Sequence, residues 1–364
     1  MPDPRVTAER LADLLGELCP SRGIALAGAV TLPCPLPHAA AFHGWLAAER
    51  HAGLAYLARD PAARVDPTVQ RPWARALLVF AQRYAAGWSA DDRSPWDGAA
   101  PGRPWTDGVA RYARGRDYHD LLLDDVKGVI DGLRERLGPF RAHAAVDTGP
   151  YLEREYAWLA GLGFFGRNSC LIHERLGSGL FLGVAAVGLA VDGLPAAGAS
   201  AADPLWGATP RTTAVSAPRA AAPGPASRCG SCRLCQDACP TGALDTPFVL
   251  DANRCLSTWT IEWHGRLPTG KEARQGGRLF GCDICQAVCP WNRRAARAGG
   301  AVRPEYGVDP AHAEVSLADL LEIDPEEFRR RFRRSPLWRA QPDGLRRNAA
   351  TVAANGGRSS EAPW

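Results

Sequence analysis

The sequence contains very little lysine and methionine, and it has no long apolar run. Only Lys127 and Lys271 of the 43 Lys and Arg residues are lysines, and alanine, glycine and proline are abundant, as in proteins from GC-rich genomes. The arginine surplus alone is therefore weak evidence for nucleic-acid binding. The longest apolar stretch, residues 180–191, is too short to span a bilayer, and the N-terminal MPDPRVTAER has no apolar signal-peptide core. These absences predict a cytoplasmic protein without a membrane partner.

Length and apolar content predict two or three folded domains. The 364 residues are 46% apolar and 23% charged, which excludes wholesale disorder and a disulfide-stapled miniprotein. Apolar periodicity predicts that helices and strands alternate up to about residue 190. The helices are expected at 7–18, 38–57 and 117–137, and the strands at 24–30, 76–81, 140–146, 170–173 and 181–191. This pattern predicts an α/β or α+β domain over residues 1–194, with the choice between a parallel and a mixed sheet left open.

The rest of the chain divides into three segments of different composition. Residues 195–228 are low-complexity Ala, Pro, Gly and Ser, which is typical of a linker or an inserted surface loop. Residues 229–293 form a cysteine-rich segment, and residues 294–364 form an arginine-rich one with helices expected at 317–321, 325–334 and 343–354. Eight arginines fall within 328–347. Such a run is usually a solvated helix face, and a polyanion-binding surface is the alternative.

Eight of the eleven cysteines lie between Cys229 and Cys289, a density that indicates metal binding in a reducing compartment. They form two runs, C-x2-C-x2-C-x3-C-P and, after a lone cysteine, C-x2-C-x3-C-P. In two-cluster ferredoxins the last cysteine of such a run binds the other cluster. We therefore predict one [4Fe–4S] cluster on Cys229, Cys232, Cys235 and Cys289, and a second on Cys239, Cys255, Cys282 and Cys285. Structural zinc is the alternative, but it leaves the middle cysteine of the first run unused.

The three other cysteines, Cys19, Cys34 and Cys170, lie among apolar residues and are expected to be buried rather than reactive.

A single acidic residue, Asp147, stands between an expected strand and an expected helix. A residue there is most often a turn or N-cap residue, and the functional alternative is a general acid at a strand end. Nearby, Gly161, Gly163 and Gly166 match G-x-G-x-x-G, but they follow a helix and lead to a strand, the reverse of a dinucleotide site. We predict a tight helix-to-strand turn there and no Rossmann site.

Together these motifs resemble the epoxyqueuosine reductase family, cobalamin-dependent iron–sulfur enzymes that complete queuosine in tRNA. The resemblance covers most of the chain, and its specificity comes from the order and spacing of several short motifs. These are residues 111–119 (RYARGRDYH), 146–153 (VDTGPYLE), 160–168 (AGLGFFGRN), 229–244 (CGSCRLCQDACPTGAL), 255–262 (CLSTWTIE), 281–292 (GCDICQAVCPWN) and 328–348 (FRRRFRRSPLWRAQPDGLRRN).

The resemblance implies an oxidoreductase that reduces epoxyqueuosine to queuosine at the wobble position of tRNA. The N-terminal domain would bind cobalamin, and a ferredoxin-like domain with two [4Fe–4S] clusters would deliver electrons from an unidentified low-potential donor. Asp147 would donate a proton to the epoxide oxygen. The implied cobalamin contacts are Arg64, Leu171, Leu182, Ser257, Cys282 and Asp283.

The resemblance also implies a tRNA-binding surface. Charged and aromatic side chains within 111–119 suit phosphates and an unstacked base, and the arginine-rich C-terminus would bind the RNA backbone. The expected tRNA contacts are Arg111, Arg114, Arg116, Tyr118, His119, Arg167, His264, Arg329, Arg330, Arg333 and Arg334. Arg167 stands where the family usually has lysine, so a planar fork replaces a point charge. The C-terminal helices resemble a short HEAT-like region, and a monomer is expected.

Two other functions share some of these features. A reductive dehalogenase also combines cobalamin with two clusters, although it usually carries an export signal. A ferredoxin-type electron carrier would use the cysteines without chemistry of its own, but it would leave the large N-terminal domain unexplained.

Overall fold

The N-terminal half is organised around an antiparallel sheet. The structure is a computed structural model and describes residues 4–86, 88, 104–194, 206–207, 228–298, 302–313 and 315–356. The main sheet has the order β4-β7-β3-β2-β9, and each neighbouring pair is antiparallel. Its strands are β2 (Ile24–Thr31), β3 (Ala76–Arg83), β4 (Ala142–Ala145), β7 (Leu180–Val187) and β9 (Trp206–Gly207). The expectation of a parallel or mixed sheet was therefore wrong, and the domain is of the α+β kind.

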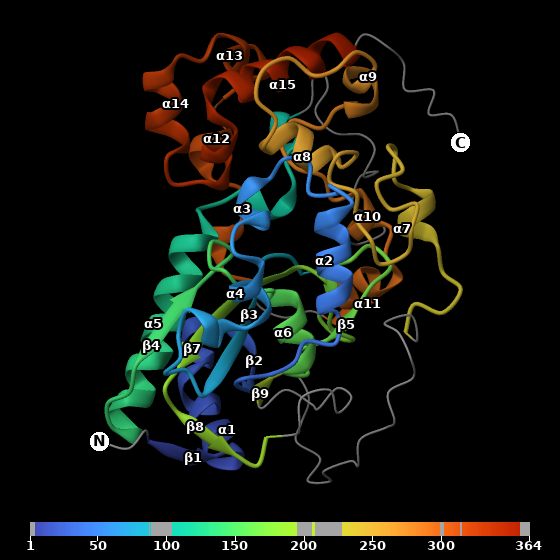
Figure 1. Cartoon of the computed structure of the whole chain (residues 1–364). Coiled ribbons are helices and arrows are strands. Elements are labelled where there is room, and N and C mark those ends of the chain that lie inside the picture. The colour runs from blue at the N-terminus through green and yellow to red at the C-terminus, as the bar shows by residue number, and fades with distance from the viewer. Residues whose placement is uncertain are drawn as a thin grey trace.

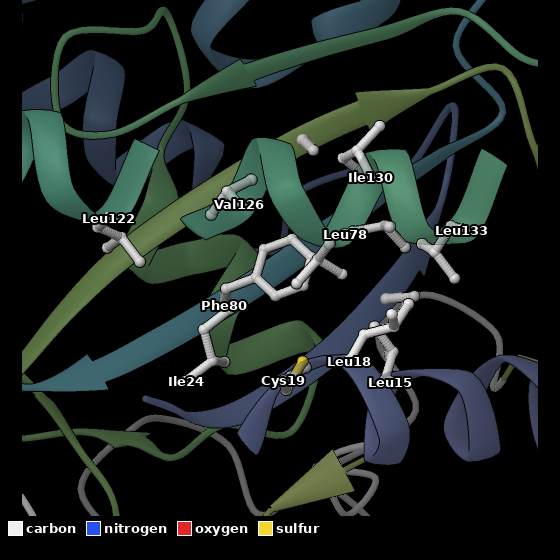
Figure 2. Close-up of a cluster of buried hydrophobic side chains, with 14 of the residues drawn as sticks. Leu15, Leu18, Cys19, Ile24, Leu78, Phe80, Leu122, Val126, Ile130 and Leu133 are labelled. Carbon is white, nitrogen blue, oxygen red and sulfur yellow. The ribbon is translucent and has the colours of Figure 1, made fainter. Parts of the chain in front are cut away.

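Two long helices cover one face of this sheet. Helix α1 (Ala8–Leu18) begins at Thr7, whose side chain accepts from the Arg10 amide, and α5 (Tyr118–Leu137) begins at Asp117, which caps it in the same way through the His119 amide. Figure 2 shows leucines of both helices packed against Leu78 and Phe80 of β3. Because β3 is buried at all eight positions, both faces of the sheet must be covered.

The opposite face carries shorter elements that lead to the candidate site. Helix α6 (Glu153–Leu159) packs there together with a small hairpin of β5 (Phe164–Phe165) and β6 (Leu171–Ile172). Gly161 and Gly163 form the turn between α6 and β5, as predicted, and Gly166 follows β5 in the connection to β6. Gly163 approaches the carbonyl of Ile172 so closely that a Cβ would lie 2.5 Å from its oxygen.

Two expected elements are interrupted. The helix expected at 38–57 is two short helices, α2 (Ala39–Ala47) and α3 (Ala55–Ala58), because Glu49, Ala52 and Gly53 adopt positive φ and turn the chain. Helix α4 (Pro61–Val65) follows them. The strand expected at 181–191 ends at Val187, and β8 (Ala190–Asp192) instead pairs in parallel with β1 (Arg5–Thr7).

The segment 195–228 contributes one strand to the main sheet. Strand β9 pairs with Leu26 and Ala27 at the free edge of β2, which a pure linker would not do. The other residues of this segment, except 228, lie outside the described residues, so its assignment as a linker or inserted loop stays a prediction.

The cysteine-rich segment and the C-terminus are helical. Their helices are α7 (Leu234–Asp237), α8 (Leu256–Ile261), α9 (Lys271–Gln275), α10 (Ile284–Ala287), α11 (Pro290–Ala298), α12 (Pro310–Ala313), α13 (Leu317–Glu322), α14 (Pro325–Phe332) and α15 (Gln341–Gly356). Helices α13, α14 and α15 gather at the top of Figure 1. None of the helices in the described part of the chain has the length and apolar character that a membrane span needs.

A separate apolar core holds the C-terminal helices, and part of the N-terminal half belongs to it. Trp105, Val109 and Ala113 are buried with Phe280 and with residues of α13–α15. Val109 also bridges Phe280 in a parallel arrangement. The segment around 105–113 thus packs with the C-terminal helices, although the proposed boundary at 194 assigned it to the first domain.

Candidate functional site

The four cysteines predicted to bind the first cluster line one cavity of about 230 Å³. Cys229 and Cys232 come from the loop that precedes α7, Cys235 lies in α7, and Cys289 comes from the turn between α10 and α11. No three His, Cys, Asp or Glu side chains among the described residues are placed to hold a single metal ion. The four thiols line a shared cavity, an arrangement that suits a cubane cluster.

The other four cysteines form a second group. Burial raises the pKa of Cys282 to about 12, and the neighbouring Cys255 contributes in the same direction. Burial likewise raises the pKa of Cys255, with a further contribution from Cys239. The pKa of Cys285 is raised by its hydrogen bond with Cys170 and by burial, and the neighbouring Cys282 and Cys255 raise it further. Cys239 thus neighbours Cys255 in this group, whereas Cys289 lines the other cavity. The assignment of the two crossed ligand sets stays a prediction.

The remaining cysteines differ from one another. Cys19 and Cys34 are buried, as predicted. Cys170 is only partly buried and shares a hydrogen bond with Cys285, so the expectation that it is buried like the other two was wrong.

Asp147 lies just beyond β4 and faces three ionisable groups. The Tyr118 hydroxyl donates to its Oδ2 at 3.0 Å, and Nε2 of His119 lies 3.4 Å from the same oxygen. The backbone N–H of Asp147 donates to Oε1 of Glu153 at 2.8 Å. Asp147 holds a left-handed conformation with φ of 58°, and 64% of its side chain is open to solvent. A strained, accessible carboxylate held by specific partners is typical of a functional residue.

The charges of this group are interdependent. Burial alone would lower the pKa of His119, but hydrogen bonds to Asp117 and Asp147 raise it to about 9. The surrounding protein would raise the pKa of Asp147, but the hydrogen bond and charge of His119 bring it below its usual value. Burial, together with the charge of Asp147, raises the pKa of Glu153 to about 8. At neutral pH the site therefore holds an ionised Asp147 between a protonated His119 and a protonated Glu153.

Glu153 was not assigned a role from the sequence. Its only signal was a second carboxylate six positions after Asp147 within VDTGPYLE. Spacing alone does not show that the chain turns back so that this carboxylate accepts the Asp147 amide.

The residues implied for cobalamin lie on several elements around this region. Arg64 on α4 is 8% exposed and donates to the Tyr56 carbonyl at 2.6 Å, while its Nε has no hydrogen-bond partner within the described part of the chain. Leu171 on β6 and Leu182 on β7 belong to one apolar cluster. Asp283, beside Cys282, is buried and accepts the Arg111 amide at 2.6 Å. Ser257 lies on α8, two residues after Cys255.

Several expected tRNA contacts have other roles in the structure. The Tyr118 ring is 9% exposed and stacks on Phe181 with 4.0 Å between ring centroids, so it is not an open platform for a base. Arg114 donates to the carbonyl of Val109, inside the fold. Arg167 lines the first-cluster cavity and donates to the Gly230 carbonyl at 2.8 Å. The sequence shows charged and aromatic residues mixed at these positions, but it does not show which of their side chains are buried.

The other expected contacts are more open. Arg116 and His264 are exposed, and the Arg111 guanidinium lies 5.0 Å from the ring centroid of Trp88. Within the C-terminal run, Arg329, Arg333 and Arg334 are exposed and their side chains have no hydrogen-bond or ion-pair partner among the described residues. Arg330 instead pairs with Glu327 at 2.6 Å.

The run 328–347 therefore divides into exposed and internal arginines. Arg347 donates to the carbonyls of Trp259, Trp263 and Gly265 and so joins α15 to the end of α8. Of the exposed members, Arg334 lies next to the candidate site, because its carbonyl accepts the amide of Asp117, the residue that pairs with His119.

Comparison with known proteins places these features in one family. Residues 228–292 match a 4Fe-4S double cluster binding domain, and residues 64–148 match the family described as epoxyqueuosine reductase QueG, DUF1730. The epoxyqueuosine reductase of Pseudomonas aeruginosa is 34% identical, with 87% of this chain and 78% of the relative covered. That of Gloeobacter violaceus is 35% identical, with 87% of each covered. The chain belongs to the epoxyqueuosine reductase family.

Solved structures of epoxyqueuosine reductases have the same fold. A crystal structure with an epoxyqueuosine-modified stem loop of tRNA-Tyr matches with a TM-score of 0.76 at 27% identity, over 97% of this chain and 84% of that one. A Bacillus subtilis structure, in which the catalytic loop is swung out of the active site, matches with a TM-score of 0.74, also at 27% identity and with the same coverage. The predicted family, the oxidoreductase class and the iron–sulfur cofactor are thus confirmed for this epoxyqueuosine reductase family member.

Proposed function

We propose that this protein reduces epoxyqueuosine to queuosine in tRNA, with Asp147 passing a proton to the epoxide oxygen. The observation that supports this most directly is the Tyr118, His119 and Glu153 arrangement around an accessible Asp147, beside exposed arginines. Removing the epoxide oxygen as water consumes two electrons and two protons. The site must therefore combine an electron source with a proton source.

His119 is the residue that would supply Asp147 with its proton. Asp147 is ionised at neutral pH in the free protein, whereas His119 is protonated, and 3.4 Å separates His119 Nε2 from Asp147 Oδ2. As negative charge develops on the epoxide oxygen, movement of the His119 proton through Asp147 to that oxygen becomes favourable. Tyr118, fixed by stacking on Phe181, orients the carboxylate through its hydroxyl.

The electron path would use the two crossed cysteine sets and cobalamin. The donor chemistry fits: four thiols surround one cavity and four more are grouped nearby. For cobalamin, the buried Arg64 with its unpartnered Nε offers a donor, and Leu171, Leu182, Ser257, Cys282 and Asp283 supply apolar and polar contacts. When bound, cobalamin supplies the electron-rich centre that this chain's side chains lack. An external low-potential protein would feed the clusters.

A tRNA partner is supported by the exposed arginines beside the site. Arg329, Arg333 and Arg334 offer three charges that have no ion-pair partner among the described residues, and the exposed Arg116 and His264, with the half-buried Arg111, are the other expected contacts. Unpaired arginines suit phosphates because the guanidinium fork matches phosphate oxygens.

The function is tested by anaerobic reconstitution with iron, sulfide and cobalamin, followed by incubation with epoxyqueuosine-containing tRNA and a chemical reductant. We expect mass spectrometry of the digested nucleosides to show queuosine. Unchanged epoxyqueuosine from a protein that carries both clusters and cobalamin contradicts the proposal.

The exposed C-terminal arginines give a prediction about tRNA affinity. In the triple variant Arg329→Ala, Arg333→Ala and Arg334→Ala, the dissociation constant of a stem loop should rise about tenfold or more at moderate salt, because each lost phosphate contact reduces counterion release. The slope of log affinity against log salt should also become shallower. Arg346→Ala is the matched control, because Arg346 pairs with Asp343 and donates to Ile323. An unchanged slope in the triple variant would show that these arginines are only a solvated helix face.

The protonation states give a prediction about pH. The single-turnover rate of pre-reduced protein should fall as the pH rises through about 8, where Glu153 ionises beside the developing oxyanion, and fall again near 9, where His119 loses its proton. In Glu153→Gln the side chain stays neutral and its carbonyl still accepts the Asp147 amide. This variant should therefore lose the limb near pH 8 and keep the later one. Profiles of wild type and variant that superimpose would contradict the role given to Glu153.

A further inference from the structure

An exposed aromatic ring lies beside the catalytic region, and the mechanism above gives it no role. Tyr56 on α3 is 40% exposed, and only Val69, Leu234 and Val308 are other large apolar residues with such exposure in the described part of the chain. Its backbone is held by the buried Arg64, whose guanidinium donates to the Tyr56 carbonyl at 2.6 Å. An exposed ring on a fixed backbone is a rigid surface rather than a loosely attached side chain.

The ring is joined by an arginine from the C-terminal half. The guanidinium carbon of Arg339 lies 5.6 Å from the Tyr56 ring centroid, within the range of a cation–π contact. Arg339 comes from a 3₁₀ helix, Pro336–Ala340, between α14 and α15, and its neighbours Leu337 and Ala340 are buried. In Figure 1, α3 reaches up to the C-terminal helices. The pair therefore bridges the two halves of the molecule.

Glu262 orients Arg339 but uses only one of its three guanidinium nitrogens as a donor. Both carboxylate oxygens of Glu262 accept from Nε of Arg339, at 3.0 and 3.1 Å. The two terminal guanidinium nitrogens donate to nothing within the described residues, and 55% of the Arg339 side chain is exposed. The guanidinium is thus oriented while its outer edge is free for a ligand.

This surface lies close enough to Asp147 for their charges to interact. Arg339 helps to lower the pKa of Asp147, after the larger influence of His119 and Tyr118. Because burial, Glu262 and Asp147 all raise the pKa of Tyr56, to about 12, its hydroxyl stays neutral at physiological pH. A neutral ring beside a cation, near a carboxylate that acts on a nucleoside, is a surface suited to a base.

We propose that Tyr56 and Arg339 form a stacking platform for an unpaired base of the tRNA anticodon loop. Single-stranded bases are recognised by stacking on aromatic rings and guanidinium planes, whereas phosphates require only charge. The free edge of Arg339 can also donate to the base or to its phosphate. This inference rests on the proposed tRNA substrate and adds a binding site that the arginines of α14 do not provide.

The test compares Tyr56→Leu with Tyr56→Phe, using an epoxyqueuosine-modified stem loop and fluorescence anisotropy. The leucine variant keeps apolar bulk but loses the ring, so its dissociation constant should rise about ten- to a hundredfold, the range of one lost base stack. The salt slope should stay at the wild-type value because no phosphate contact is removed. The phenylalanine variant should bind like wild type. Arg339→Lys, which keeps the charge but loses the plane, should weaken binding several-fold.

One control and three outcomes decide whether the stacking platform exists. Iron content and the thermal unfolding temperature of each variant must match wild type, which excludes misfolding as the cause of weak binding. If wild type neither binds nor converts the stem loop, the proposed function fails. If wild type does both and Tyr56→Leu binds equally well, the platform alone is wrong. A loss of affinity in Tyr56→Leu that comes with a shallower salt slope also contradicts stacking.

Discussion

Asp147→Asn is expected to lower the single-turnover rate about a thousandfold, within the range measured for removal of a general acid. Asparagine has nearly the same shape as aspartate and can still accept the Tyr118 hydroxyl, but its amide cannot take up and release a proton at neutral pH. It also tolerates the left-handed backbone that Asp147 adopts at φ of 58°, so the loop should keep its geometry. An alanine at this position would also strain the left-handed backbone, so a loss of activity in Asp147→Ala could not be assigned to the missing carboxylate alone.

The design needs a control that removes a carboxylate without removing the acid. Asp117→Asn serves, because Asp117 accepts from Nδ1 of His119 at 2.7 Å and does not contact Asp147. This variant should lower the pKa of His119 and slow turnover only about tenfold, since it acts through the histidine. Both variants should retain their iron content and stem-loop affinity. Turnover by Asp147→Asn at a rate near that of Asp117→Asn would remove Asp147 from the proton path.

Local motifs explain why the cofactor residues could be predicted. The cysteine spacing is short enough to define a loop around a cluster, and the structure brings Cys289 to the cavity of Cys229, although sixty residues separate them. Asp147 could be singled out because it follows a strand, but its partners come from distant parts of the chain. Tyr118 and His119 belong to the first turn of α5, and nothing in the sequence shows that this helix begins beside β4.

Long-range pairing explains most of the errors in the fold. Strand β3 is apolar at nearly every position because both of its faces are covered, and such a run is equally typical of parallel and antiparallel sheets. Its partners, β2 and β7, are far apart in sequence. The sequence of 38–57 predicts one continuous helix, but the chain turns within it. The turn could not be predicted because Glu49 and Ala52, which adopt positive φ there, are residue types that rarely do so.

Burial, which composition does not reveal, separates the arginines. Arg347 and Arg333 belong to the same basic run, yet one satisfies three backbone carbonyls while the other is exposed. A charged side chain that satisfies buried carbonyls is part of the fold, and its removal leaves those carbonyls unpaired. Only the exposed members can exchange counterions for phosphates. The net charge of +4 averages over both kinds.

The crossed ligand sets predict opposite results for two double variants. Cys229→Ala with Cys289→Ala removes two ligands of one cluster, so reconstituted protein should fall from about eight iron atoms to about four and keep one intact [4Fe–4S] signal in electron paramagnetic resonance. Cys229→Ala with Cys239→Ala removes one ligand from each cluster. Each is then left with three thiolates, and neither intact signal should remain.

If the clusters were not crossed, and each cluster used its own run of cysteines, the two results would be exchanged. Cys229 and Cys239 would then share a cluster, and their joint removal would leave the other cluster intact. Cys34→Ala is the control for loss of a buried thiol, because Cys34 lies in an apolar cluster of the main sheet and should leave both clusters in place. Cys285 lies in α10 and Cys289 follows two residues after that helix ends, yet the two are predicted to bind different clusters. The crossed arrangement would therefore also place the two clusters close together, as rapid electron transfer toward Asp283 and the cobalamin contacts requires.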